Sequence, residues 1–421
     1  MLKRWLTRLP LTDRVTFAWD LPSGVLWGIG SGLVVPLISV IARRLGMCAE
    51  MMAVMLAMPC AASLFSLYVG HVAERRPKMP LVFWPGILGR GLFLLVPFVR
   101  GATGFFLVVS LFYLFISLMG PSYAAIMRSN YGDANRGKLM GDVRIASMLV
   151  SAVASWVGGA VLQAAPDSWR WLFPVAGLFG ILSILVFKKI PVCSEYRATA
   201  ARRAPPASAG PGVGVALRAF LSSLRGLGRD RTLLLFLGAL FLQAFPDKIL
   251  VPLEPIRLVD ELGLDYHEAG LILGTVTSVA GIAGYWVWGR LSRGRRPLGI
   301  FLFVALAATL RLPFFAVARG PLGLVPWSLL AGFAGAGFDI IVLLVILDLA
   351  APERFILSYG LASMLIGIRG ILGPILGTVL YANRLLTIAQ ITWLACGISL
   401  LGVGCLVLLF LSLRRRDGAA S

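Results

Sequence analysis

Arg76-Pro77-Lys78-Met79-Pro80-Leu81 is a basic loop that leads into an apolar run, and a similar stretch, Arg293-Gly294-Arg295-Arg296-Pro297-Leu298, begins about 217 residues later. Other short matches keep the same order and nearly the same offset: Leu45-Gly46 with Leu262-Gly263, Pro97-Phe98 with Pro313-Phe314, Arg100-Gly101 with Arg319-Gly320, and Gly158-Gly159 with Gly377-Thr378. Each dipeptide is weak evidence alone. Their common order indicates that the chain contains two copies of one unit, and parallel repeats of membrane-length segments are typical of one kind of secondary transporter.

The composition places these repeats in a membrane. Of the 421 residues, 58% are hydrophobic and only 14% are charged, and the mean hydropathy is +0.87. Apolar runs of roughly 20 residues are long enough to cross the hydrocarbon core of a bilayer. Such runs lie near 16–42, 47–69, 80–99, 103–127, 141–163, 168–187, 232–253, 268–289, 298–318, 322–347, 356–381 and 386–412. The sequence therefore predicts an all-α integral membrane protein of twelve transmembrane helices.

The net charge of +20 raises the question of a nucleic-acid partner. With the N-terminus assigned to the cytoplasm, most of the 39 Lys and Arg residues fall on the cytoplasmic side, whereas the outer loop Glu254–Glu268 is acidic. This is the positive-inside asymmetry of a membrane protein. Arg43-Arg44, on the outer side, is a local exception. We predict a cell (inner) membrane protein with both termini in the cytoplasm and no nucleic-acid partner.

Residues for metal, cofactor or covalent chemistry are few. The five cysteines form no C-x-x-C pair, and there are only two histidines, so the sequence predicts no metal site and no cofactor. No P-loop and no Ser-His-acid pairing is present. We therefore expect no catalytic residues, and the chain is not expected to be an enzyme.

The longest polar segment divides the chain into two halves. We predict an N-terminal six-helix half at 1–190, a cytoplasmic central linker at 191–231 and a C-terminal six-helix half at 232–421. The first part of the linker is rich in Ala, Arg, Pro and Gly, which is typical of a flexible connection. The second part has apolar residues at a helical period, and this predicts an amphipathic helix, either in the membrane interface or packed beneath the bundle.

The loop between the second and third runs reads Gly70-His71-Val72-Ala73-Glu74-Arg75-Arg76-Pro77-Lys78. It resembles the signature loop of the major facilitator superfamily, G-x-L-A-D-R-x-G-R-R/K. Gly70 and Arg75 match that pattern, Glu74 replaces its Asp, and Lys78 fills its last basic position. The resemblance implies two pseudo-symmetric six-helix bundles, and it implies alternating access around a site near the midplane.

The same resemblance implies a role for the loop. In the superfamily it latches the two halves together in the outward-facing state, so Gly70, Glu74, Arg75 and Lys78 are the candidate latch residues. A charge pair at the mouth, worth about 1 kcal/mol, can break during each cycle. The alternative is that the basic residues serve only to fix topology.

Charges inside the apolar runs are functional candidates, because burying a charge in a membrane is costly. Asp339 and Arg369 lie in the tenth and eleventh runs, at depths of about 20 and 25 Å from the turn that joins them. Since the resemblance places both runs beside the central cavity, we predict that they meet there, either as a substrate or proton site or as an internal strut.

The other candidates lie in runs one, four and seven. Asp247-Lys248 follows Pro246, and the prolines in this stretch predict a broken helix beside the cavity. Trp27 and Tyr123 are aromatic candidates for stacking on a substrate. A structural role is favoured for Asp20, Asp142 and Arg144, which lie near the cytoplasmic ends of their runs. The resemblance places the third and ninth runs at the periphery, so packing or lipid contact is favoured for Arg90 and Arg311.

These observations predict a secondary active transporter that moves a small solute by alternating access, coupled to protons or another ion, with membrane lipids around it and as a monomer. Two alternatives stay open. A lipid or lysolipid transporter of the same fold needs only a lateral opening and cationic residues beside it. A membrane receptor or scaffold that does not transport would normally carry a soluble sensory domain, whereas the largest non-membrane segment here is the central linker.

Overall fold

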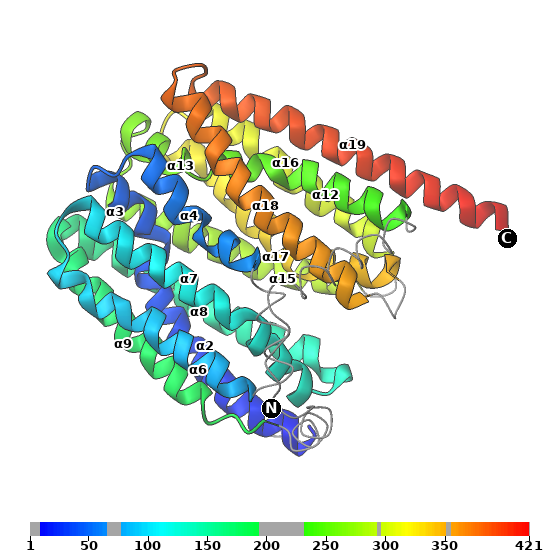
Figure 1. The fold of residues 1–421 in the computed structure, drawn as a ribbon, viewed down its shortest axis with the longest axis horizontal. Helices are drawn as coiled ribbons and strands as arrows, with labels where there is room; N and C mark the ends of the chain where they lie inside the picture. Colours follow the sequence, from blue (N-terminus) through cyan, green and yellow to red (C-terminus); the bar gives the residue numbers. More distant parts are fainter. Residues whose placement is uncertain (1–8, 65–76, 193–230, 293–295, 351–354, 421) are drawn as a thin grey trace, which may run out of the picture.

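The computed structural model describes residues 9–64, 77–192, 231–292, 296–350 and 355–420, and all elements found there are helical (Figure 1). The first half consists of α2 (Leu11–Val34), η1 (Val35–Leu37), α3 (Ile38–Arg44), α4 (Ala49–Leu64), α6 (Lys78–Gly91), η2 (Leu92–Phe98), α7 (Gly101–Asn130), α8 (Asp133–Ala164), η3 (Pro166–Ser168) and α9 (Trp169–Phe187). The predicted linker 191–231 lies almost wholly outside the described residues.

The second half repeats this arrangement. Its elements are α12 (Arg231–Leu250), α13 (Glu254–Ile256), η4 (Arg257–Glu261), α14 (Tyr266–Ala269), η5 (Gly270–Val276), α15 (Thr277–Leu291), α16 (Pro297–Val317), η6 (Pro321–Leu324), α17 (Val325–Leu349), α18 (Phe355–Ala382) and α19 (Ile388–Ala420). Across the described ranges, eleven helical segments are long and apolar enough to cross a membrane, and Ala49–Ala61 is a shorter apolar helix. The prediction of an all-α membrane fold is confirmed.

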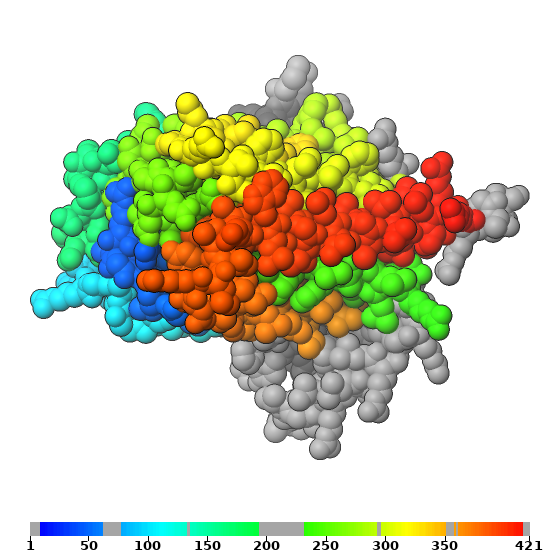
Figure 2. All heavy atoms as spheres, turned by 90° about the horizontal axis from the view of Figure 1, so that it is seen from above, coloured from blue at the N-terminus to red at the C-terminus, as the bar shows by residue number. Residues whose placement is uncertain are grey.

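The start of α2 and the end of α19 lie at the same end of the bundle, here called the proximal end (Figure 1). The opposite, distal end is formed by the turns near residues 45–48, 99–100, 165–168, 262–265, 318–324 and 383–387. Viewed from above, α19 runs along the surface of the molecule and reaches beyond its neighbours toward the C-terminus (Figure 2).

Proline breaks the first transmembrane segment near its distal end. Pro36 lies within η1, between α2 and α3, and a proline at this position cannot donate to the carbonyl of Gly32 one turn earlier. The hydroxyl of Ser155, on α8, donates to that carbonyl at 2.9 Å. The break therefore does not leave this backbone oxygen unpaired, and the hydrogen bond ties α2 to α8.

A stripe of small residues brings α2 against α8. Gly24, Gly28 and Gly32 recur every four residues on α2, and a Cβ on any of them would lie within 2.7 Å of an atom of α8. Helices in a membrane often pack through such stripes. Since lipid tails are as apolar as the side chains, no hydrophobic driving force brings the helices together, and close van der Waals contact has to stabilise them. Larger residues there would push the two helices apart.

Two turns confirm the internal repeat. Gly46 follows α3 with φ of +82°, and Gly263 follows η4 with φ of +65°. A left-handed glycine ends a helix at low steric cost. Because these glycines stand at equivalent positions of the two copies, the same turn closes the first transmembrane segment of each half.

The buried apolar residues form three clusters, of which one spans both halves and two do not. The largest joins both halves at the distal end, and it includes Val34 and Phe105 of the first half with Leu253 and Phe315 of the second. The other two clusters lie toward the proximal end, and each is confined to one half. The halves therefore share a core at the distal end, whereas their proximal cores are separate.

Candidate functional site

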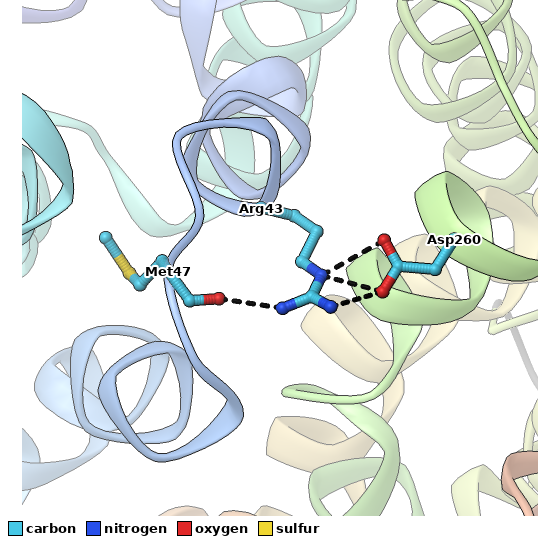
Figure 3. Close-up of polar contacts among 3 residues, drawn as sticks. All are labelled: Arg43, Met47 and Asp260. Carbon is cyan, nitrogen blue, oxygen red and sulfur yellow. Dashed lines mark hydrogen bonds and ion pairs between the residues drawn. The ribbon is translucent and has the colours of Figure 1, made fainter.

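The distal end is held together by an arginine–aspartate pair between the halves (Figure 3). The Nε of Arg43 donates to Oδ1 and Oδ2 of Asp260 at 3.1 and 2.9 Å, and Nη2 also contacts Oδ2. The Nη1 of the same guanidinium donates to the carbonyl of Met47 at 3.0 Å, which fixes its orientation. Bidentate pairing of this kind is the strongest form of surface ion pair.

The two partners are equivalent positions of the repeat. Their separation of 217 residues is the offset that relates Gly46 to Gly263, and each partner stands three residues before its glycine. Residues related by a two-fold axis face each other when they lie near that axis. Arginine in one copy and aspartate in the other turn this symmetric contact into an attraction.

Arg44 makes a second contact beside the first. Its Nη2 donates to the carbonyl of Leu264 at 2.6 Å, and its guanidinium lies 4.0 Å from the ring centroid of Tyr266. The backbone N–H of Tyr266 in turn donates to Oε1 of Gln163, at the end of α8. Arg43 and Arg44, which depart from the predicted charge asymmetry, thus both have partners in the acidic loop Glu254–Glu268 of the other half.

Close backbone packing completes this distal junction. A Cβ at Gly159 of α8 would lie 2.7 Å from the carbonyl oxygen of Tyr266 and 3.2 Å from the Cα of Gly270. The hydroxyl of Thr275, on η5, donates to the carbonyl of Ala152 at 2.8 Å. Helices α8 and α14–η5 can approach this closely only because their facing residues are small.

A second group of charges lies between the halves nearer the proximal end. Arg144 of α8 is within electrostatic range of Asp20 and Tyr123 in its own half and of Tyr285 and Asp339 in the other. The hydroxyl of Tyr285 donates to Oδ2 of Asp339 at 2.5 Å. This charge cluster links α8 to α15 and α17 across the boundary between the halves.

The environment of Asp339 indicates water between the halves. Its carboxylate is exposed although it lies inside α17, about 15 Å from the proximal end of that helix. Ionised side chains in membrane segments face the bundle interior or a water-filled space, because lipid would not solvate them. The contacts with Tyr285 and Arg144 place Asp339 on the interior side, where the proximal cores are separate.

The structure does not bring Asp339 and Arg369 together. Helices α17 and α18 follow each other in sequence, but α17 packs mainly on α15 and α16, and α18 packs on α4 and α12. Arg369 accordingly lies near Cys60 of α4 and Lys248 of α12. Counting residues gives the depth of a side chain along a helix, but it does not determine the direction in which each helix face points.

Asp247 and Lys248 have different surroundings although they are adjacent. Asp247 forms an ion pair with Arg311 of α16, inside the second half. Lys248 faces Arg369 and Glu254. The helix break expected from the prolines is present, since α12 ends at Leu250 and α13 begins at Glu254.

The two aromatic candidates are already in contact with protein groups. The guanidinium carbon of Arg90 lies over the ring of Trp27, 4.1 Å from its centroid, and the Nη1 of Arg90 donates to the carbonyl of Gly180 at 2.7 Å. Arg90 is therefore buried by packing inside the first half. Tyr123 packs on Phe187 and lies beside the charge cluster.

The signature loop falls mostly outside the described residues, which exclude Gly70, Glu74 and Arg75. Lys78 is described, and it is buried at the start of α6. Among the described residues, no three His, Cys, Asp or Glu side chains come together as a metal site would require. Sequence reasoning did not select Arg43, Asp260 or Tyr285 for the site, and it assigned Arg144 a structural role.

Comparisons with known proteins agree with this architecture. The chain is similar to a crystallised mutant of the nucleoside transporter NupG. The match covers 94% of this chain and 100% of the NupG chain, with a TM-score of 0.69 and 15% identity. It is also similar to a bacterial homologue of the human lysosomal transporter Spinster, crystallised in an inward-facing and unoccupied conformation. This match covers 96% of each chain, with a TM-score of 0.60 and 14% identity. No match was found among curated proteins. The sequence model described as Major Facilitator Superfamily matches residues 21–245 and again 235–421. The chain therefore belongs to the Major Facilitator Superfamily.

Proposed function

We propose that the chain is a secondary active transporter that carries a small solute by alternating access, and that this structure corresponds to its inward-facing state. The observation that carries the proposal is the unequal division of the apolar core. One cluster spans both halves at the distal end, and separate clusters lie toward the proximal end. Two bundles joined at one end and separate at the other can exchange these arrangements by rocking about a site between them.

The proposed orientation follows from charge. The acidic turn that contains Asp260 and Asp265 lies at the distal end, and most of the basic residues that the structure describes lie toward the proximal end. The positive-inside rule therefore assigns the distal end to the outside. A reporter active only outside the cytoplasm should be silent when fused at Gly210 and active when fused at Gly263. The reverse pattern would contradict the assignment.

We also propose that proton movement is coupled to transport through Asp339. Its carboxylate is exposed between the halves, hydrogen-bonded to Tyr285, and faced by Arg144 from the opposite half. Gaining or losing a proton there changes the attraction between Asp339 and Arg144. A group of this kind changes the preference of the protein for one arrangement of the halves.

Proteoliposomes with an imposed proton gradient test both parts of this proposal. The wild-type protein should accumulate at least one member of a panel of labelled solutes. Asp339→Asn should reduce gradient-driven accumulation about tenfold, because an amide does not take up or release a proton as a carboxylate does, and it should retain solute exchange. Asp348→Asn, which removes an exposed carboxylate at the proximal end of the same helix, is the matched control. Equal accumulation by Asp339→Asn and the wild type would exclude this carboxylate from coupling.

A further inference from the structure

Three helices meet around Arg369. A Cβ at Gly370 of α18 would lie 2.2 Å from Sγ of Cys60 on α4, and a Cβ at Gly373 would lie 2.5 Å from Cβ of Lys248 on α12. Contacts this close leave no space for side chains at either position. Helix α18 therefore brings Arg369 to a junction of α4, from the first half, with α12, from the second.

Within the part of the chain that the structure describes, no residue directly neutralises either cation at this junction. Lys248 and Arg369 repel each other electrostatically. No hydrogen bond or ion pair joins either side chain to another described residue, and the Nε of Arg369 is buried without an acceptor. Asp247, the carboxylate next in sequence to Lys248, is already paired with Arg311.

The one nearby carboxylate does not balance both charges. Among the described residues, Glu254 is the acidic side chain within electrostatic range of Lys248, and no carboxylate lies within electrostatic range of Arg369. Two cations and one carboxylate leave an excess positive charge inside a membrane bundle. Such charges are costly and mark binding sites for ions or substrates.

An aromatic surface continues from the cations along α12. Phe241 and Phe245 precede Lys248 by seven and three residues, and this spacing places all three on one face of the helix. The two rings are stacked, with centroids 5.3 Å apart and planes inclined by 13°. Both phenylalanines are only partly buried. A cationic end and an apolar wall therefore follow each other along the helix.

We propose that Lys248 and Arg369 bind the acidic group of the transported solute, and that this solute is an organic anion whose apolar body lies along Phe241 and Phe245. The inference rests on the proposed transport function. A carboxylate or phosphate oxygen supplies the acceptor that no described residue gives to the Nε and terminal nitrogens of Arg369. The excess positive charge at this junction would disfavour a cationic solute, and a neutral solute would leave that charge in place.

Ligand-induced thermal stabilisation of the purified full-length chain tests this assignment. The probes share one phenyl body and differ in charge: 4-phenylbutyrate and phenyl phosphate are anions, 4-phenylbutanol is neutral, and 4-phenylbutylamine is a cation. The anions should raise the melting temperature and the other two should not. Equal stabilisation by the neutral or cationic probe, or no stabilisation by either anion, would overturn the proposal.

Variants identify the residues responsible. Lys248→Gln and Arg369→Gln should each weaken binding of the anions by about tenfold to a hundredfold, and Arg369→Lys should retain part of the affinity because it keeps the charge. Arg319→Gln, which removes an exposed arginine at the distal end, should bind as the wild type does. Without ligand, Arg369→Gln should melt no lower than the wild type, since it removes an unpaired charge. Unchanged anion binding by Lys248→Gln and Arg369→Gln would overturn the assignment.

Two further comparisons distinguish a lipid from a soluble anion as the ligand, and failure of the proposed site from failure of the proposed transport function. Stabilisation by lysophosphatidic acid in preference to phenyl phosphate would identify a lipid headgroup as the ligand, and the reverse preference would identify a soluble anion. An anion that binds but is not moved in proteoliposomes would leave the site standing and contradict the transport function. Transport of a neutral or cationic solute that is unaffected by Arg369→Gln would support the function and contradict this site.

Discussion

Gly159→Leu should reduce transport by about a hundredfold and leave the protein folded. The nearest atoms to a Cβ at this position all belong to the opposite half, at Tyr266, His267 and Gly270, and the closest is a backbone carbonyl oxygen at 2.7 Å. A leucine cannot fit there while the distal end is closed, and a backbone atom cannot move aside as a side chain can. Because the clash lies between the halves, each six-helix bundle should keep its own packing.

Solute uptake by proteoliposomes, measured with the amount of folded protein by size-exclusion chromatography, checks this prediction. Gly404→Leu is the matched control, because a Cβ at that exposed position of α19 has no neighbour within 4 Å, so uptake should stay close to that of the wild type. Uptake by Gly159→Leu equal to that of Gly404→Leu would show that transport does not require the close contact of α8 with α14 and η5.

Asp260→Arg should reduce transport by about thirtyfold, and combining it with Arg43→Asp should restore most of the loss. The pair is partly open to solvent, with 26% of the Arg43 side chain and 37% of the Asp260 side chain exposed, so its attraction is worth about 1 kcal/mol. Reversing one charge replaces this attraction by a repulsion of similar size, and the difference of about 2 kcal/mol corresponds to about thirtyfold.

The double reversal separates the ion pair from other roles of the two residues. Since the partners occupy equivalent positions of the repeat, exchanging them should regenerate the bidentate contact in the opposite direction. Initial uptake rates of the two single variants and the double variant complete a double-mutant cycle. Activity of the double variant no better than that of Asp260→Arg would mean that the residues act separately and not as a pair.

The fold was predictable from the sequence wherever one physical constraint decides the outcome. A helix that crosses a membrane must be long and apolar and must satisfy its own backbone, so the apolar runs predicted the helices, and the repeat predicted two bundles. Membership of this superfamily of transporters confirms the expectation that the chain is not an enzyme. The break after Leu250 was also predictable, because a proline removes a backbone donor wherever the helix lies.

The candidate site was harder to predict from the sequence, because side-chain contacts depend on helix rotation and on which helices become neighbours. Asp339 and Arg369 were expected to meet but belong to different groups of charges. Arg144 was assigned a structural role, because nothing in the sequence shows that α8 faces the second half. The Arg43-Arg44 exception to the charge asymmetry was the one available signal of the distal junction, and its meaning required knowledge of its partners.

The central claim is that the distal ends of the two halves are closed in this structure and part during transport. The most direct test is the distance between spin labels at Ala164, at the end of α8, and Asn383, in the turn after α18. Both positions are exposed at the distal end, and all native cysteines are replaced in the labelled protein. One distance should dominate in the wild-type background, and Gly159→Leu should transfer most of the population to a longer distance. The same distance distribution in both backgrounds would contradict the claim.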